Sequence, residues 1–248
     1  NLFMQKKLFN FKFVLMAIMA IIFTVPMASF VQANNDPQNI ECAPRSVCIK
    51  KGHCGKNLSW ILHKDGNLEI FYEKFKDKNN RFKHLKDGEM ENYSFANNKM
   101  PGWNKKSHYI KIVTIQPGVK SIGDFAFLDL DAKGIKNPAT NSHRLKELVI
   151  NSDPDKIGIG AFMGCESLKE VFSYNFNPQL VRSMIGMFYG CKSLQNINFP
   201  NFKPQTFRSI YFNYMFNGCE SLREINLPYV RFAKDIHCMF QGCEQLKD

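Results

Sequence analysis

A repeating order of apolar and polar residues runs through the second half of this 248-residue chain. Each copy reads as a small residue or Met, then Phe, any residue, Gly, Cys, two polar residues and Leu. The four copies are Ala161–Leu168, Met187–Leu194, Met215–Leu222 and Met239–Leu246. Each complete copy leads into a short apolar stretch with the two-residue period of a β-strand.

The spacing of these apolar stretches defines the fold class. They start at Ile110, Leu145, Leu168, Leu194, Leu222 and Leu246, so the spacings are 35, 23, 26, 28 and 24 residues. Periods of 20–29 residues with this leucine pattern are typical of leucine-rich repeats. One copy cannot bury its own apolar side, but stacked copies form a continuous core with parallel strands along the stack. We therefore predict a mainly β repeat solenoid of about five coils over residues 110–248.

Two features depart from the regular spacing. The 35-residue spacing is a 23-residue repeat with a 12-residue insertion, which Gly134 and Pro138 identify as a loop within 128–144. Ahead of the repeats, Leu58–His63 and Asn67–Tyr72 read as strands, and Asp65-Gly66 between them is a strong hairpin signal. Such a hairpin would cap the first coil, because an open end exposes apolar surface and unpaired strand edges. The chain stops where a new strand is due, so we expect a truncated sequence, with a further cap or anchor beyond its end.

The first 33 residues have the layout of a secretory signal peptide. Three lysines precede an apolar run over Phe13–Val25, and Val31 and Ala33 stand at the −3 and −1 positions of a cut before Asn34. A membrane-spanning helix needs about 20 apolar residues, so an uncleaved anchor is the weaker interpretation and we expect no transmembrane span. We expect cleavage after Ala33 and a secreted or cell-surface protein in an oxidising environment.

The charge of the chain is moderately basic. There are 33 Lys and Arg residues against 22 Asp and Glu, a formal charge of +11, and three of the lysines lie in the first 33 residues. The remaining charge is spread out, which argues against a specific nucleic-acid binder. The densest basic stretch lies within 74–111, with Lys74–Lys86, Lys99, Lys105, Lys106 and Lys111. It predicts either a site for a polyanion or a solvated Lys- and Asn-rich loop.

The eight cysteines fall into groups. Cys165, Cys191, Cys219 and Cys243 occupy the same place in each copy, which favours a column of buried structural thiols over a metal or redox site. Cys42, Cys48 and Cys54 are six residues apart, unlike the Cys-x-x-Cys pairs of zinc ribbons. In a secreted chain we expect a disulfide among these three in preference to zinc. Cys238 lies far along the stack and is a poor partner for them.

Outward strand positions form columns across the coils. The first is Lys146, Lys169, Gln195 and Arg223; the second is Glu147, Glu170, Asn196 and Glu224; the third is Val149, Phe172, Asn198 and Asn226. Repeat proteins bind partners on such extended surfaces, and an exposed aromatic such as Phe172 often anchors an interface. The alternative is a solvated sheet whose neighbouring opposite charges neutralise one another. We take these columns as the candidate protein-binding face.

Two segments resemble the BspA-like leucine-rich repeats of bacterial and protist surface proteins: Ser121–Phe127 and Ala161–Val171. The copies built on Met-Phe are similar to a related variant of the same class. Upstream, Cys54–Ile70 and Val113–Val119 are similar to the lead-in of such repeats in secreted gut-bacterial proteins. The resemblance covers residues 54–248. It implies adhesion or protein binding at a cell surface, with no catalytic residues to transfer.

The sequence therefore predicts four parts: a signal peptide (1–33), a cysteine-containing segment (34–53), a hairpin cap with a polar loop (54–109) and repeats (110–248). We find no Gly-x-Ser-x-Gly motif, phosphate-binding loop or HExxH motif. We therefore expect a binding protein, not an enzyme, without a cofactor or metal. The leading interpretation is binding of a host or matrix protein. The alternatives are a spacer that presents another domain and a polyanion binder.

Overall fold

The computed structural model describes residues 48–73, 88–94, 97–128, 145–173, 176, 180–199, 202, 210–227, 230 and 233–247. The chain divides into two units, Asn1–Asn39 and Ile40–Asp248, and all of these residues belong to the second. The predicted signal peptide, Cys42, the basic residues 74–86 and most of the segment 128–144 lie outside the described residues. Within the described part, no helix is long and apolar enough to cross a membrane.

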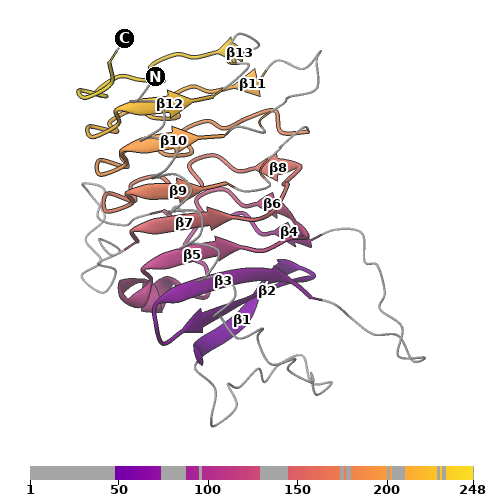
Figure 1. Ribbon diagram of the computed structural model, residues 1–248. Helices are drawn as coiled ribbons and strands as arrows, with labels where there is room; N and C mark the ends of the chain where they lie inside the picture. The colour runs from indigo at the N-terminus through magenta and orange to yellow at the C-terminus, as the bar shows by residue number, and fades with distance from the viewer. Residues whose placement is uncertain are drawn as a thin grey trace, which may run out of the picture. The chain divides into compact units, whose positions relative to one another are not determined.

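Three antiparallel strands begin the described fold (Figure 1). They are β1 (Cys48–Lys56), β2 (Leu58–His63) and β3 (Asn67–Tyr72), and β2 pairs with both of its neighbours. At the turn between β2 and β3 the amide of Gly66 donates to the carbonyl of His63 at 3.1 Å. Gly66 has a φ of 95°, a conformation that residues with a Cβ rarely adopt. The predicted hairpin is confirmed with the strand limits that the sequence indicated, and β1 is an additional strand.

Parallel strands continue from β3 along one side of the core. They are β5 (Ile112–Ile115), β7 (Glu147–Ile150) and β9 (Glu170–Phe172), followed by the parallel pair β10 (Asn196–Asn198) and β12 (Glu224–Asn226). We call the series from β3 to β12 the first ladder. Its inward residues are buried, as Leu148 and Ile197 show. The predicted stack of short parallel strands is therefore confirmed.

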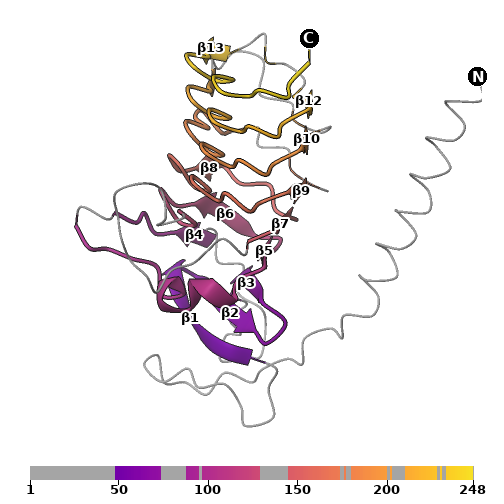
Figure 2. The same ribbon diagram turned by 90° about the vertical axis from the view of Figure 1, so that its left-hand side faces the viewer.

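A second ladder lies on the other side of the core (Figure 2). It contains β4 (Gly88–Met90), β6 (Val119–Ile122) and β8 (Lys156–Ile157), and then the parallel pair β11 (Ile210–Tyr211) and β13 (Ala233–Asp235). Because β1 pairs with both β2 and β4, the two ladders join in one nine-stranded sheet of order β8-β6-β4-β1-β2-β3-β5-β7-β9. The sequence analysis did not predict the second ladder, whose strands have only two to four residues.

Stacked aromatic rings run through the core and hold successive coils together. In order along the stack they are Trp103, Phe127, Phe162, Phe188, Phe216 and Phe240. Trp103 directly precedes the 3-10 helix η1 (Asn104–Tyr109). Neighbouring ring centroids are 4.9–5.9 Å apart, and their planes differ by at most 17°. The Phe of each inner coil is therefore buried and fills the core, whereas Phe240, at the end of the stack, is partly exposed.

One turn position in each coil has a left-handed backbone. Gly160 and Gly186 occupy it in two coils, both with a φ of 59°, whereas Phe125, Tyr214 and Cys238 occupy it in others with φ of 51°, 58° and 51°. A residue with a Cβ adopts this conformation at a cost of about 1–2 kcal/mol. Cys238, which the sequence analysis left without a role, is thus the turn residue of the last described coil.

Candidate binding face

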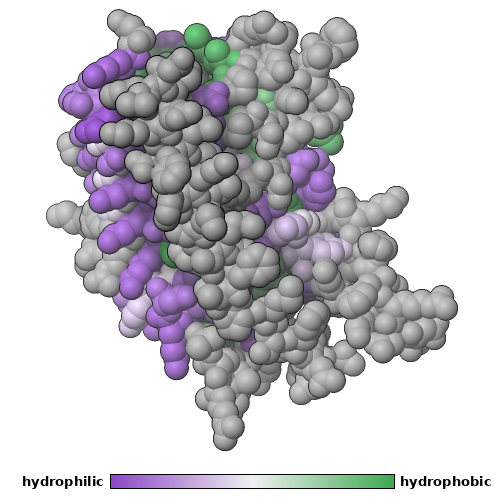
Figure 3. Space-filling view, viewed as in Figure 1, coloured by the Kyte–Doolittle hydropathy of each residue, from purple (hydrophilic) through white to green (hydrophobic). Residues whose placement is uncertain are grey.

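The side of the first ladder that points away from the core presents three columns of side chains, which we call the ladder face. In the coils of β7, β9 and β10 two outward residues stand between two buried ones, as Lys169 and Glu170 do between Leu168 and Val171. Hydrophilic residues gather along the left-hand side of the molecule in Figure 3, beside the starts of these strands. The repeat thus fixes the position of each outward side chain without using that side chain in the core.

The first column of the ladder face is cationic. Its exposed members are Lys111, Lys146, Lys169, Gln195 and Arg223, so the structure adds Lys111 to the predicted column. The amide of Lys146 donates to the carbonyl of Lys111 at 2.8 Å, and the amide of Lys169 donates to the carbonyl of Lys146 at 2.9 Å. Neighbouring strands are about 4.8 Å apart, so these like charges follow one another at the strand spacing.

The second column is anionic. Glu147 stands opposite Glu170 in the register, and Asn196 stands opposite Glu224. Among the described residues, the ion pairs are His53–Glu73, His63–Glu69, Lys99–Glu91 and Lys192–Glu166. None of them involves either column. Each coil from β7 to β12 therefore presents a cation beside an anion, or two amides, without an ion pair between described residues that ties these charges down.

The third column changes character along the stack. Val149 and Phe172 are half-buried, so Phe172 is less accessible than an exposed anchor would be, whereas Asn198 and Asn226 are exposed. Nδ2 of Asn226 donates to Oδ1 of Asn198 at 2.9 Å. The hydroxyl of Ser173 donates to the carbonyl of Asn198 at 2.7 Å. The ladder face is therefore apolar in this column at β7 and β9, and rich in amides at β10 and β12.

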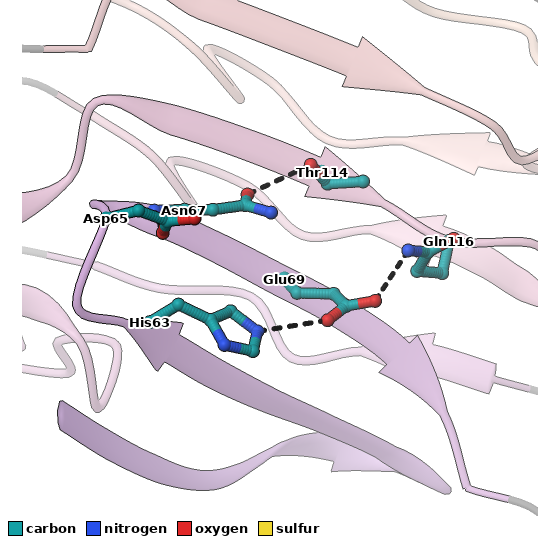
Figure 4. A network of polar contacts seen from close by, with 6 residues as sticks. All are labelled: His63, Asp65, Asn67, Glu69, Thr114 and Gln116. Carbon is teal, nitrogen blue, oxygen red and sulfur yellow. Dashed lines mark hydrogen bonds and ion pairs between the residues drawn. The ribbon is translucent and has the colours of Figure 1, made fainter. Parts of the chain in front are cut away.

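A polar network occupies the amino-terminal end of the same face (Figure 4). Glu69 on β3 accepts from Nε2 of His63 at 3.2 Å and from Nε2 of Gln116 at 2.5 Å. The hydroxyl of Thr114 donates to Oδ1 of Asn67 at 3.0 Å. The sequence analysis missed this network, although the two-residue period of Asn67–Tyr72 places Asn67 and Glu69 on the outward side.

The two ionisable groups of this network have shifted pKa values. The hydrogen bond to Glu69 raises the pKa of His63, although partial burial opposes the shift. The hydrogen bond from His63 lowers the pKa of Glu69, again against the effect of burial, and Gln116 adds to the lowering. Both shifts favour the charged pair, so this end of the ladder face is internally satisfied, in contrast to the two charged columns.

A second cluster, on β1 and β2, contains serine, histidine and carboxylate without the geometry of a hydrolase triad. Nδ1 of His53 lies 3.0 Å from Oγ of Ser59 and 3.0 Å from Oε1 of Glu73, and Ser59 also donates to Glu73. In a triad the serine and the acid contact different ring nitrogens, so that a proton can pass from one side of the imidazole to the other. Here both contact the same nitrogen. Burial raises the pKa of Glu73, and the cluster links β1, β2 and the end of β3.

The repeat cysteines form a regular series of thiol hydrogen bonds. The Sγ atoms of Cys165, Cys191, Cys219 and Cys243 donate to the carbonyls of Phe127, Phe162, Phe188 and Phe216, at 3.2, 3.3, 3.2 and 3.1 Å. Each thiol thus bonds to the preceding coil, and none of the four is in a disulfide. Burial raises the pKa of Cys219 and of Cys243. No group of three or more His, Cys, Asp or Glu side chains in the described ranges is placed to hold a metal ion.

The amino-terminal cysteines differ from one another. Cys48, at the start of β1, is disulfide-bonded. Cys54 is a buried thiol outside any disulfide, and burial raises its pKa. Cys42 lies outside the described residues.

The described lysines of the basic stretch do not act alike. Lys99 pairs with Glu91 at 3.1 Å. Nζ of Lys106 lies 5.6 Å from the ring centroid of Tyr109. Lys105 is exposed in η1, and Lys111 belongs to the first column of the ladder face. The described lysines that a polyanion would contact in 97–111 therefore lie partly in η1 and partly on the ladder face.

A comparison with known protein families agrees with this architecture. The family model described as BspA type leucine rich repeat region matches residues 88–172 and 133–248 with six copies. A leucine-rich repeat protein from Eubacterium ventriosum is 17% identical with a TM-score of 0.46, over 73% of this chain and 44% of that one. A leucine rich cell surface protein from Faecalibacterium prausnitzii is 19% identical with a TM-score of 0.42, over 79% and 53%. The chain thus spans about half the length of these two proteins. No curated protein matches it.

Proposed function

Because the chain belongs to the BspA-type leucine-rich-repeat family, we propose that it is secreted or displayed at a cell surface and binds other proteins through the ladder face. The observation that carries the proposal is the pair of charged columns, exposed in successive coils and without ion pairs among the described residues. The ladder fixes the main chain beneath these side chains, so a partner that binds there does not have to order it. Host or extracellular-matrix proteins are the partners that we expect for an adhesin of this kind.

The segment 1–33 supports the location. Its lysines, its apolar run and the small residue before Asn34 form the pattern of a signal peptide. A disulfide at Cys48 is consistent with an oxidising compartment. Expression of the full chain in a secretory host, followed by amino-terminal sequencing of the exported protein, should give Asn34 as its first residue. Retention in the cell with residues 1–33 intact would contradict this location.

Binding can be measured with the exported full chain on immobilised fibronectin, laminin and collagen. We expect binding of at least one of these at physiological salt and a loss of about tenfold in the variant Lys169→Ala/Glu170→Ala, which removes one charge of each sign. The matched control is Asp155→Ala/Lys156→Ala, which also removes one charge of each sign, because both residues are exposed on the second ladder side. No binding to any matrix protein or to cultured cells, or equal losses in both variants, would contradict the proposal.

One observation favours a polyanion as a second candidate. Lys111, Lys146 and Lys169 follow one another along the first column, close to the spacing at which strands pair. Retention on heparin that falls steeply with added salt, and that is lost in Lys111→Ala/Lys146→Ala, would support this alternative. The adjacent column of glutamates opposes it, so we place it second.

A further inference from the structure

We propose that the ladder face binds a second copy of this chain, in a parallel face-to-face dimer. The inference rests on the proposed function in that it uses the same face, and it names the partner. Its basis is the order of the charges. In every coil from β7 to β12 the first-column residue is balanced by its second-column neighbour: Lys146 by Glu147, Lys169 by Glu170, Gln195 by Asn196 and Arg223 by Glu224. The coil of β5 differs, because Lys111 stands there beside the apolar Ile112, which occupies the second column opposite Glu147.

Such a pair of columns is complementary to itself. Consider a twofold axis that runs parallel to the stack, between the first and second columns, in the plane where two faces meet. This axis places the first column of one copy over the second column of the other, at the same coil. Lys146 then meets Glu147 of the other copy, Lys169 meets Glu170, and Arg223 meets Glu224. The amides of Gln195 and Asn196 meet each other in the coil without charges, so all four coils from β7 to β12 match.

The charges also exclude the other face-to-face arrangement. A twofold axis perpendicular to the stack, in the same plane, would place lysines over lysines and glutamates over glutamates. Like charges brought together at an interface cost several kcal/mol, so this arrangement is disfavoured. A twofold interface uses the same patch on both copies. The order of charges therefore selects one geometry, in which both chains point the same way along the stack.

The columns are available for such contacts. Their lysines, arginine and amides are exposed, as are Glu170 and Glu224, and only Glu147 is half-buried. The ion pairs among the described residues involve other side chains. A second copy would therefore gain contacts without first breaking ion pairs within either ladder face. Ion pairs across an interface set orientation and partner choice, which is the role that the columns have here.

Charge reversal followed by mixing tests the dimer. Sedimentation of the exported full chain at roughly 100 μM, where a dimer with a Kd of about 100 μM or below is well populated, should show a monomer–dimer equilibrium that weakens with salt. Lys146→Glu/Lys169→Glu makes both columns anionic in two coils, and Glu147→Lys/Glu170→Lys makes both cationic. Each variant alone should dimerise about 100-fold more weakly. An equimolar mixture of the two should restore the dimer, because one variant is then complementary to the other.

The control and the orientation are tested separately. Lys156→Glu/Arg182→Glu changes the net charge by the same amount away from the ladder face, and it should dimerise like the unaltered chain. A mixture of Gln195→Cys and Asn196→Cys chains should be joined by a short bifunctional maleimide, because the parallel axis brings these positions together. A monomeric unaltered chain, two unaffected reversal variants, or a mixture without recovery would each overturn the dimer.

The two proposals can fail independently. A chain that stays monomeric but binds a matrix protein through the ladder face would overturn the dimer and leave the proposed function intact. A chain that dimerises as described but binds neither matrix protein nor cells would support the dimer and overturn the adhesive role.

Discussion

Removal of one ring from the middle of the aromatic stack tests whether that stack holds the coils together. Phe188 is fully buried, and its ring centroid lies 5.9 Å from that of Phe162 and 5.8 Å from that of Phe216. Phe188→Ala removes about 1.5–3 kcal/mol of side-chain burial. It also leaves a cavity between two coils, so the expected loss in the free energy of unfolding rises to about 3–5 kcal/mol. The carbonyl of residue 188 remains to accept the thiol of Cys219, because the main chain is unchanged.

The matched control lies at the end of the same stack. Phe240 is 37% exposed and stacks on Phe216 alone among the described rings. Phe240→Ala should therefore cost only about 1–2 kcal/mol. Urea unfolding followed by circular dichroism gives both losses, and hydrogen exchange shows whether the coils on either side of residue 188 open together. Equal losses at the two positions, or a loss below about 1.5 kcal/mol for Phe188→Ala, would refute the reasoning.

Three further predictions concern the thiols, a polar pair and a turn. Burial raises the pKa of Cys219, so iodoacetamide at neutral pH should label the half-buried Cys238 well before Cys219, and equal rates by mass spectrometry would contradict this. His63→Gln should cost about 0.5–1 kcal/mol in urea unfolding, mainly between the ordinary pKa values of Glu69 and His63, which are 4.5 and 6.5. The raised pKa of His63 contributes stability that is complete below pH 6.5 and is lost as the pH rises through the raised value. The lowered pKa of Glu69 contributes stability that is complete above pH 4.5 and is lost as the pH falls through the lowered value. A loss that is the same at every pH would count against this pair. Gly218→Ala should cost about 1–2 kcal/mol in thermal unfolding, because its φ is 73° although a Cβ would come no closer than 3.6 Å to a neighbouring atom, and an unchanged melting temperature would show that the backbone tolerates the side chain.

The elements that the sequence predicted correctly are those with a local signal. The alternation in Leu58–His63 and the Asp65-Gly66 turn lie within a few residues of one another, so the hairpin could be read without knowledge of the rest of the chain. The first ladder was predicted for a related reason. Its inward Leu, Ile and Val recur with the repeat, and a recurring apolar pattern is visible even when each strand is short.

The elements that the sequence analysis missed depend on partners far away in the chain. β8 has only Lys156 and Ile157, too few residues to show a period, and it exists because β6 pairs with it in parallel. β1 (Cys48–Lys56) lacks a clear alternation of apolar and polar residues and is held by β2 and β4. The contact between Glu69 and Gln116 likewise requires that β3 and β5 be neighbours. Glu69 and Gln116 are 47 residues apart in the sequence, so no local pattern shows that they meet.

The charged columns are not explained by the fold alone. Strand pairing sets the spacing of the outward side chains, whichever residues occupy those positions. Like charges directly opposite each other on paired strands destabilise a sheet, so stability by itself favours alternating signs along a column. Instead, Lys146 and Lys169 follow one another on one side, and Glu147 stands opposite Glu170 on the other. A partner that presents the opposite column offsets this repulsion, and a second copy of the chain presents that column in the required order.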